Sequence, residues 1–141
     1  MILYLDTSAL VKLYVEELAT AAVATRVDRA EAVVTARVTY AEARAAFARH
    51  AREGALSPSA LRRVVGTLDA EWPTYNVVEI NDPVVRRAGA LAERHALRGY
   101  DAVQLAAALE VRRAGGEVEF ASFDRRLNGA ARRERLRPSP L

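Results

Sequence analysis

Short apolar runs alternate with longer amphipathic segments along the whole chain. Four apolar runs are short enough to be buried strands, and they cover residues 2–5, 32–35, 76–80 and 117–122. The segments between them predict helices over residues 7–18, 20–30, 38–53, 58–72, 82–97 and 99–114, with a short helix after Asp124. Apolar strands separated by helices are typical of a parallel sheet that is covered on both faces. We therefore expect an α/β fold, a three-layer sandwich with a short parallel sheet of four or five strands flanked by helices.

Local signals at the ends of these segments refine the expected boundaries. Ser57 followed by Pro58 is a favourable start for a helix, and Asp82 before Pro83 is assigned as the cap of the next one. The last residues, RERLRPSPL, predict an additional edge strand only weakly, because they include Pro138 and a second proline.

Composition limits the classes of protein to which the chain can belong. The sequence has 141 residues, no linker and no internal repeat, so we expect a single domain over residues 1–141. The absence of cysteine excludes a disulfide framework, a thiolate metal site and a cysteine nucleophile. The first residues carry no basic leader, and no apolar run approaches the roughly 18 residues that a membrane span needs. We expect a soluble cytoplasmic protein.

The chain is basic, with a net charge of +3 that comes mainly from arginine, since Lys12 is the only lysine. Arginine binds phosphate oxygens through two parallel hydrogen bonds, so an arginine-rich surface suits a nucleic acid. A compositional bias that enriches arginine and alanine together explains the same numbers without a function.

Four acidic residues occupy positions that a parallel sheet would bring together. Asp6 and Asp124 follow predicted strands, Asp101 begins a helix beside its buried face, and Glu42 lies in the first turns of a helix among small apolar residues. Two unit charges about 4 Å apart repel by about 4 kcal/mol at an effective dielectric constant of about 20, so such a cluster implies bound cations or protonation. Oxygen ligands favour Mg²⁺ or Mn²⁺, which can activate water for phosphodiester hydrolysis.

Each of the four acids also has a purely structural interpretation. Asp6 and Asp124 are good helix caps, Asp101 interacts favourably with a helix dipole, and Glu42 suits a solvated helix surface. Their joint placement at one end of the sheet favours a site. Without these four charges the net charge rises from +3 to +7, which would attract a polyanion.

Other polar and aromatic residues near the acids have weaker claims to function. Candidates for supporting the site or binding substrate are Thr7, Ser8, Ser122, Arg98 and Arg125. Tyr40 and Tyr100 could stack on a base, although core packing accounts for both; Asp28 and Asp69 are assigned as surface charges, and His50 and His95 as ordinary helix residues.

The motifs around the four acids resemble those of PIN-domain ribonucleases, and most closely the VapC-type toxins of bacterial toxin–antitoxin pairs. The resemblance covers nearly the whole chain and rests on LYLDTSAL around Asp6, VTYAEARAAF around Glu42, LRGYDAVQLAAAL around Asp101 and FASFDRRLNGAA around Asp124. It implies an endoribonuclease that depends on Mg²⁺ or Mn²⁺, with these four acids as the catalytic and metal-binding site. It also implies a small VapB-like antitoxin protein as inhibitor, and a homodimer.

The chain departs from the family pattern at Ser122, where the family usually has threonine two residues before the last acid. A receiver-like phosphate-switch module is the alternative from another class, but it would need a lysine late in the chain, where Lys12 is the only one, and an acceptor aspartate where the third predicted strand ends in Ile80-Asn81. A dehalogenase-like phosphatase would need a second acid at Ser8, and no nucleotide-binding or serine-hydrolase motif is present. A non-catalytic α/β binding module would leave the four spaced acids unexplained.

Overall fold

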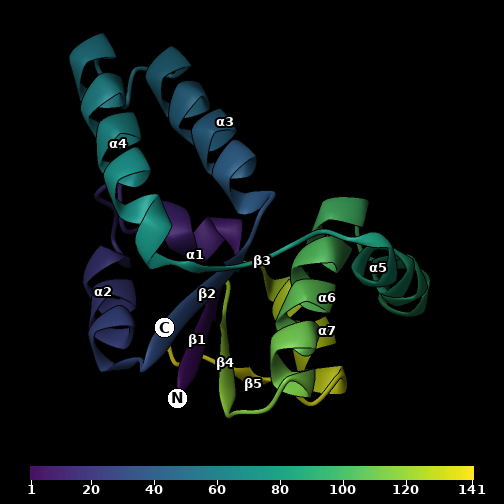
Figure 1. Ribbon diagram of the computed structural model, residues 1–141. Helices are drawn as coiled ribbons and strands as arrows, with labels where there is room; N and C mark the ends of the chain where they lie inside the picture. Colours follow the sequence, from purple (N-terminus) through teal and green to yellow (C-terminus); the bar gives the residue numbers. More distant parts are fainter.

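A computed structural model describes residues 1–141 and contains one sheet of five parallel strands (Figure 1). The strands are β1 (Ile2–Leu5), β2 (Ala32–Ala36), β3 (Asn76–Val78), β4 (Val118–Ala121) and β5 (Arg137–Pro138). Their order across the sheet is β3-β2-β1-β4-β5. The predicted α/β class and the parallel sheet are confirmed, and the weakly marked tail does form the fifth strand, at an edge where proline is tolerated.

Helices cover both faces of the sheet, which gives the expected three layers (Figure 1). One face carries α1 (Thr7–Val11), α2 (Thr20–Arg29), α3 (Thr39–Arg52) and α4 (Pro58–Glu71), and a short 3₁₀ turn (Trp72–Thr74) follows α4. The other face carries α5 (Asp82–His95), α6 (Gly99–Arg113) and α7 (Arg125–Arg133). None of the helices is both long enough and apolar enough to cross a lipid bilayer.

The sheet divides the hydrophobic core into two clusters. Side chains of β1 alternate between them, because successive residues of a strand point to opposite faces. Leu3 and Leu5 pack with α1–α4, and Tyr4 packs with α5–α7, where its ring stacks on Phe120 at a centroid distance of 5.6 Å. The central strand is thus buried on both faces, which explains its continuous apolar sequence.

The strand order reverses at β1, since the chain passes from β1 to β2 and β3 on one side and returns to β4 on the other. In open parallel sheets ligands bind beyond the carboxyl ends of the strands that flank such a reversal. Asp6 directly follows β1, and the turn with Asp124 follows β4. The topology therefore places these two acids at the position where a ligand site is expected.

The largest error of the sequence analysis concerns the predicted helix over residues 7–18. The structure ends α1 at Val11 and continues in turns as far as the start of α2. Tertiary contacts replace the helix, because Tyr14 packs edge-on against Phe47 and hydrogen-bonds to Tyr75. The strand predicted over residues 76–80 is also shorter and ends at Val78.

The cap of α5 is Asn81 and not Asp82. The Asn81 side chain accepts a hydrogen bond from the Val84 backbone N–H at 3.1 Å, whereas Asp82 lies inside the first turn and pairs with Arg86. With Asn81 as the cap, Pro83 is the second helical residue, where its missing N–H is also tolerated, so its adjacency to Asp82 did not mark the cap. The sequence assignment therefore failed by one residue.

Exchanging these two neighbours tests the assignment. Asn81→Ala should lower the free energy of unfolding by about 1 kcal/mol, the usual contribution of a cap, or roughly 4 °C in melting temperature. Asp82→Ala removes only an exposed ion pair and should change stability by less than about 0.5 kcal/mol. Urea denaturation of both variants measures the difference, and a larger loss in Asp82→Ala would contradict the assignment.

Candidate active site

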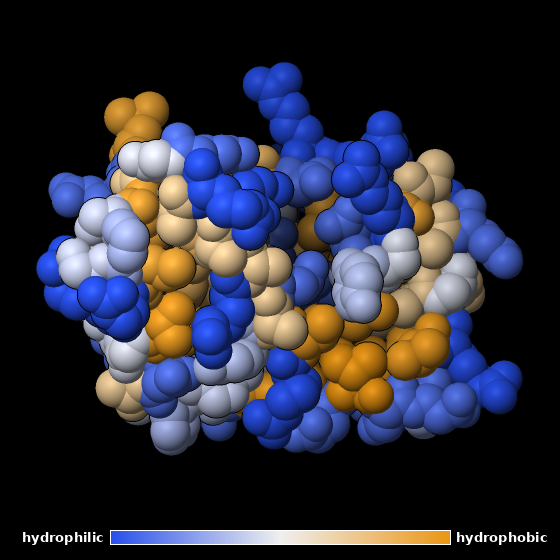
Figure 2. Space-filling model, turned by 90° about the horizontal axis from the view of Figure 1, so that it is seen from above, coloured by the Kyte–Doolittle hydropathy of each residue, from blue (hydrophilic) through white to orange (hydrophobic).

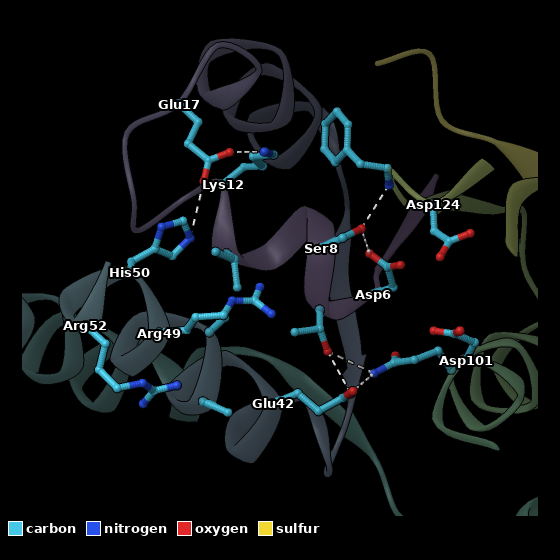
Figure 3. Close-up of a pocket in the computed structure, with 16 residues that line it drawn as sticks. Asp6, Ser8, Lys12, Glu17, Glu42, Arg49, His50, Arg52, Asp101 and Asp124 are labelled. Atoms are coloured by element: carbon cyan, nitrogen blue, oxygen red, sulfur yellow. Dashed lines mark hydrogen bonds and ion pairs between the residues drawn. The ribbon is translucent and has the colours of Figure 1, made fainter. Parts of the chain in front are cut away.

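The four predicted acids line one cleft of about 670 Å³ at the carboxyl end of the sheet (Figure 3). The cleft lies between α1 and α3 on one side and α6 and the turn after β4 on the other. Seen from this end, the molecule is hollowed between its two helical layers, with hydrophilic residues around the hollow (Figure 2). Residues that are far apart in the sequence thus share one solvent-accessible space.

Asp6 and Asp124 are helix caps and line the cleft at the same time. Asp6 accepts a hydrogen bond from the Ala9 backbone N–H at 2.9 Å, and Asp124 accepts one from the Leu127 backbone N–H at 2.9 Å. A cap uses one carboxylate oxygen at a helix N-terminus, so capping does not occupy the second oxygen of either group. The structural and the functional interpretations of these two acids are compatible.

Burial makes Asp6 an unusual acid. It is only 4% exposed, and burial, opposed by hydrogen bonds from Ser122 and Ser8, raises its pKa to about 6 with a further contribution from the Asp124 charge. The pKa of Asp101 is also raised, first by burial and then by the charges of Asp124 and Glu42. These acids are close enough to feel one another's charge.

Asp101 lies in the first turn of α6 and projects into the cleft (Figure 3). Its carboxylate makes no hydrogen bond within the protein. None of the four acids forms an ion pair with a lysine or arginine side chain. The four carboxylates are therefore not paired directly with any basic side chain of the protein.

Glu42 is held at the other side of the cleft through one of its two oxygens. Its Oε1 accepts hydrogen bonds from the Thr7 hydroxyl at 2.7 Å and from the Gln104 side-chain amide at 2.8 Å. Its Oε2 has no partner in the protein. This arrangement fixes the direction of the carboxylate and leaves one oxygen available to a ligand.

Gln104 was missed by the sequence analysis. It is 3% exposed, and its carbonyl oxygen accepts from the Tyr4 hydroxyl at 2.7 Å while its amide also lies 3.0 Å from the Thr39 hydroxyl. The residue therefore joins β1 and α3 to α6 beneath the cleft. Because buried polar groups require partners, this network fixes which way its amide points toward Glu42.

Ser8, in the first turn of α1, and Ser122, directly after β4, form hydrogen bonds around Asp6 and Asp124. Ser8 donates to Asp6 at 2.7 Å and accepts from the Phe123 backbone N–H at 2.9 Å, and Ser122 accepts from the Asp124 backbone N–H at 3.0 Å. These contacts suit both serines to positioning the two acids.

The arginines that line the cleft are not the ones the sequence singled out. Arg98 precedes α6 and Arg125 begins α7; both are exposed, and neither lines the cleft. The Arg98 charge does act on Asp101 and opposes the increase in its pKa. Arg49 and Arg52 of α3 line the cleft instead, and neither forms an ion pair.

The histidines and tyrosines also differ in part from expectation. His50 lines the cleft 3.6 Å from Glu17, which pairs with Lys12, whereas His95 is bound to Glu134 away from it. Tyr40 packs on Trp72, in agreement with the prediction. Tyr100 is 64% exposed and lines a separate apolar groove between α5 and α6, so the expectation of core packing was wrong there.

The four carboxylates line the same cleft but do not converge on a single metal position. As the side chains lie, no three Asp, Glu or His groups come close enough together to hold one metal ion. Asp6, Asp101 and Asp124 point toward the same space from three different elements (Figure 3). Such a set can bind a hydrated cation through one or two carboxylates, with water molecules completing its coordination.

Comparison with known proteins identifies the family. The PIN domain model matches residues 3–133. The chain is 38% identical over 139 residues to ribonuclease VapC45 of Mycobacterium tuberculosis, covering 99% of this chain and 95% of the relative.

Two solved structures share the fold. The crystal structure of FitAcB from Neisseria gonorrhoeae superimposes with a TM-score of 0.70 at 20% identity, covering 94% of each chain. A toxin–antitoxin complex from Klebsiella pneumoniae gives a TM-score of 0.64 at 17% identity, covering 86% of this chain and 85% of that one. The resemblance seen in the four acidic motifs is confirmed: the chain belongs to the PIN-domain family and is a homologue of the VapC ribonucleases.

Proposed function

We propose that residues 1–141 form one nuclease domain, a VapC-type endoribonuclease that hydrolyses RNA phosphodiester bonds with Mg²⁺ or Mn²⁺. Asp6, Glu42, Asp101 and Asp124 are its catalytic and metal-binding residues. The observation that carries the proposal is that four carboxylates from four elements line one cleft with no lysine or arginine paired to any of them. Family membership favours this activity over a receiver-like switch or a non-catalytic module.

The donor set fits a hard divalent cation. All four groups offer oxygen, and the chain has no cysteine to favour a softer metal. The raised pKa values of Asp6 and Asp101 show that the cleft disfavours their charged forms in the absence of a counter-charge. A bound cation would supply that counter-charge.

The residues divide into holding and positioning roles. Asp6, Asp101 and Asp124 would hold the cation, and Glu42 would offer the oxygen that its bonds to Thr7 and Gln104 leave free. When bound, the divalent ion lowers the pKa of water and offsets charge on the phosphate. The protein then needs no histidine or lysine base.

Supporting residues orient these groups and meet the substrate. We assign Thr7, Ser8 and Ser122 to positioning, because their hydroxyls already bond to the acids or to the turns that carry them. Arg98 and Arg125 are exposed and close in sequence to Asp101 and Asp124, and they would contact RNA phosphates outside the cleft.

The toxin role and its partners follow from the relatives. VapC45 is a ribonuclease, and one structural neighbour is a toxin–antitoxin complex. We propose that this chain is likewise the toxin of such a pair, that a VapB-like antitoxin inhibits it, and that it acts as a homodimer. Coexpression with the protein encoded beside it, followed by copurification and an inhibition assay, tests this role.

Asp101→Asn should abolish cleavage without unfolding the protein. The side chain makes no hydrogen bond that the amide could break, so the melting temperature should be unchanged in the absence of metal or slightly higher. RNA cleavage by the purified variant should fall by about 100-fold or more, the size of losing one electrostatic stabiliser. Asp28→Asn, which changes an exposed acid outside the cleft, is the control; undiminished cleavage by Asp101→Asn would refute the assignment.

Divalent ions should stabilise the wild type through the same carboxylates. A ligand that binds only the folded state raises its stability, so adding Mg²⁺ or Mn²⁺ to protein treated with EDTA should raise the melting temperature. The increase should be much smaller in Asp6→Asn and unchanged in Asp28→Asn. An equal increase in Asp6→Asn would count against a metal role for that residue.

The pH dependence of stability should reveal the burial of Asp6. Because its folded pKa of about 6 exceeds the unfolded value of 3.8, the folded state binds more protons between these values, and stability falls as pH rises through this range. In EDTA, Asp6→Asn should therefore exceed the wild type in unfolding free energy by up to about 3 kcal/mol at pH near 7.5 and by less at pH near 4.5. Urea denaturation measures both, and a difference that does not depend on pH would contradict the assignment.

A further inference from the structure

Phe123 is the one apolar aromatic side chain that lines the cleft, and it is left partly exposed there. Its side chain is 36% exposed and lines the cleft beside Asp124, whereas Phe47 and Phe120 are completely buried in the two core clusters. Phe123 belongs to neither cluster. A single partly exposed apolar ring is ordinary on a protein surface, so what distinguishes Phe123 is its place in the cleft beside Asp124.

The backbone holds this ring at a fixed place relative to the acids. The Phe123 N–H donates to Ser8, which also donates to Asp6, and the next N–H, that of Asp124, donates to Ser122. The ring is thus carried by the turn that positions two of the proposed catalytic residues. A group bound to the ring would lie in the same cleft as the four proposed catalytic acids.

Basic side chains line the same cleft as the Phe123 ring. The Lys12 ammonium lies 5.2 Å from the ring centroid, within the range of a cation–π contact, and is itself paired with Glu17. Arg49 lines the cleft opposite and has no ion pair (Figure 3). One cleft therefore combines an aromatic face, a guanidinium suited to phosphate and the acidic cluster.

We propose that Phe123 is the stacking platform for the RNA base next to the scissile phosphate, and that Arg49 contacts a neighbouring phosphate of the same strand. The proposal rests on the nuclease function proposed above. Aromatic side chains bind single-stranded RNA by stacking on unpaired bases, and arginine binds the backbone between them. The site would therefore select unpaired RNA, because a base in a duplex cannot reach the ring.

Binding measured in an inactive protein tests the platform independently of cleavage. In an Asp101→Asn background, the affinity for a short, fluorescently labelled single-stranded RNA of randomised sequence is compared with and without Phe123→Ala. We expect Phe123→Ala to weaken binding about tenfold. Phe123→Tyr should retain the affinity, and Phe123→Leu, which keeps the apolar bulk without an aromatic face, should lose it.

Two controls separate stacking from a structural effect. Tyr100→Ala removes a more exposed aromatic ring in the separate groove and should leave RNA affinity unchanged. Phe123→Ala should remain folded and lower the melting temperature by only a few degrees, since the ring is outside both core clusters. The same RNA annealed to its complement should bind with little dependence on Phe123.

Cleavage kinetics then test whether the base beside the cleaved bond is the one that stacks on Phe123. In an oligonucleotide that the otherwise unmodified protein cleaves, removing the base beside the cleaved bond should raise KM about tenfold with little change in kcat. In Phe123→Ala the same abasic substitution should have no further effect, because the stacking partner is already absent.

The outcomes separate the two proposals. Equal RNA affinity of the wild-type and Phe123→Ala side chains in the Asp101→Asn background would overturn the stacking role. An abasic effect that persists undiminished in Phe123→Ala would also overturn it. So would a Phe123→Ala variant that loses binding of a protein partner and keeps its RNA affinity. Absence of cleavage by the wild type with Mg²⁺ or Mn²⁺ would overturn the nuclease function, while Phe123-dependent RNA binding would still support the platform.

Discussion

Parallel pairing of β1 with β4 is the constraint on which the site depends. It sets Leu5 beside Ala121, and the Asp6 N–H continues the ladder by donating to the Ala121 carbonyl at 3.1 Å. Two turns separated by more than a hundred residues in sequence are thereby joined at the point where the strand order reverses. A slip of one residue in this register would turn the alternating side chains to the opposite faces and separate the acids.

The same arrangement creates an electrostatic conflict. Asp6 is buried next to other acids, and hydrogen bonds from Ala9 and Ser8 offset only part of the free energy required to bury its charge. A side chain chosen for stability alone would not need a charge there, since serine or asparagine also caps a helix. This conflict supports the proposed cation site, since perturbed electrostatics of this kind concentrate at functional positions.

Around the acids, the cleft is built from residues with complementary tasks. Gln104 and Thr7 hold Glu42 from beneath, and the Ser8–Phe123 contact fixes the turn after β4. Arg49 contributes positive charge from α3, on the wall opposite α6. The acids are thus held by a rigid polar network, while the aromatic and basic groups face the space that a substrate would fill.

The sequence by itself determined the layered α/β fold, nearly all strands and helices, and the common placement of the four acids at one end of the sheet, because apolar periodicity and position along strands and helices are local properties. It did not determine the end of α1, where packing of Tyr14 overrides helical periodicity, or the cap of α5, since Asn81 and Asp82 are similarly favourable caps. Only the tertiary structure decided which side chains face the cleft. Gln104 had one local signal, as a polar residue within an alanine- and leucine-rich helix face, and Arg49 had another, seven residues after Glu42 on the same face of α3. Phe123 had none, because whether a phenylalanine enters a core or lines a cleft depends on the elements packed around it.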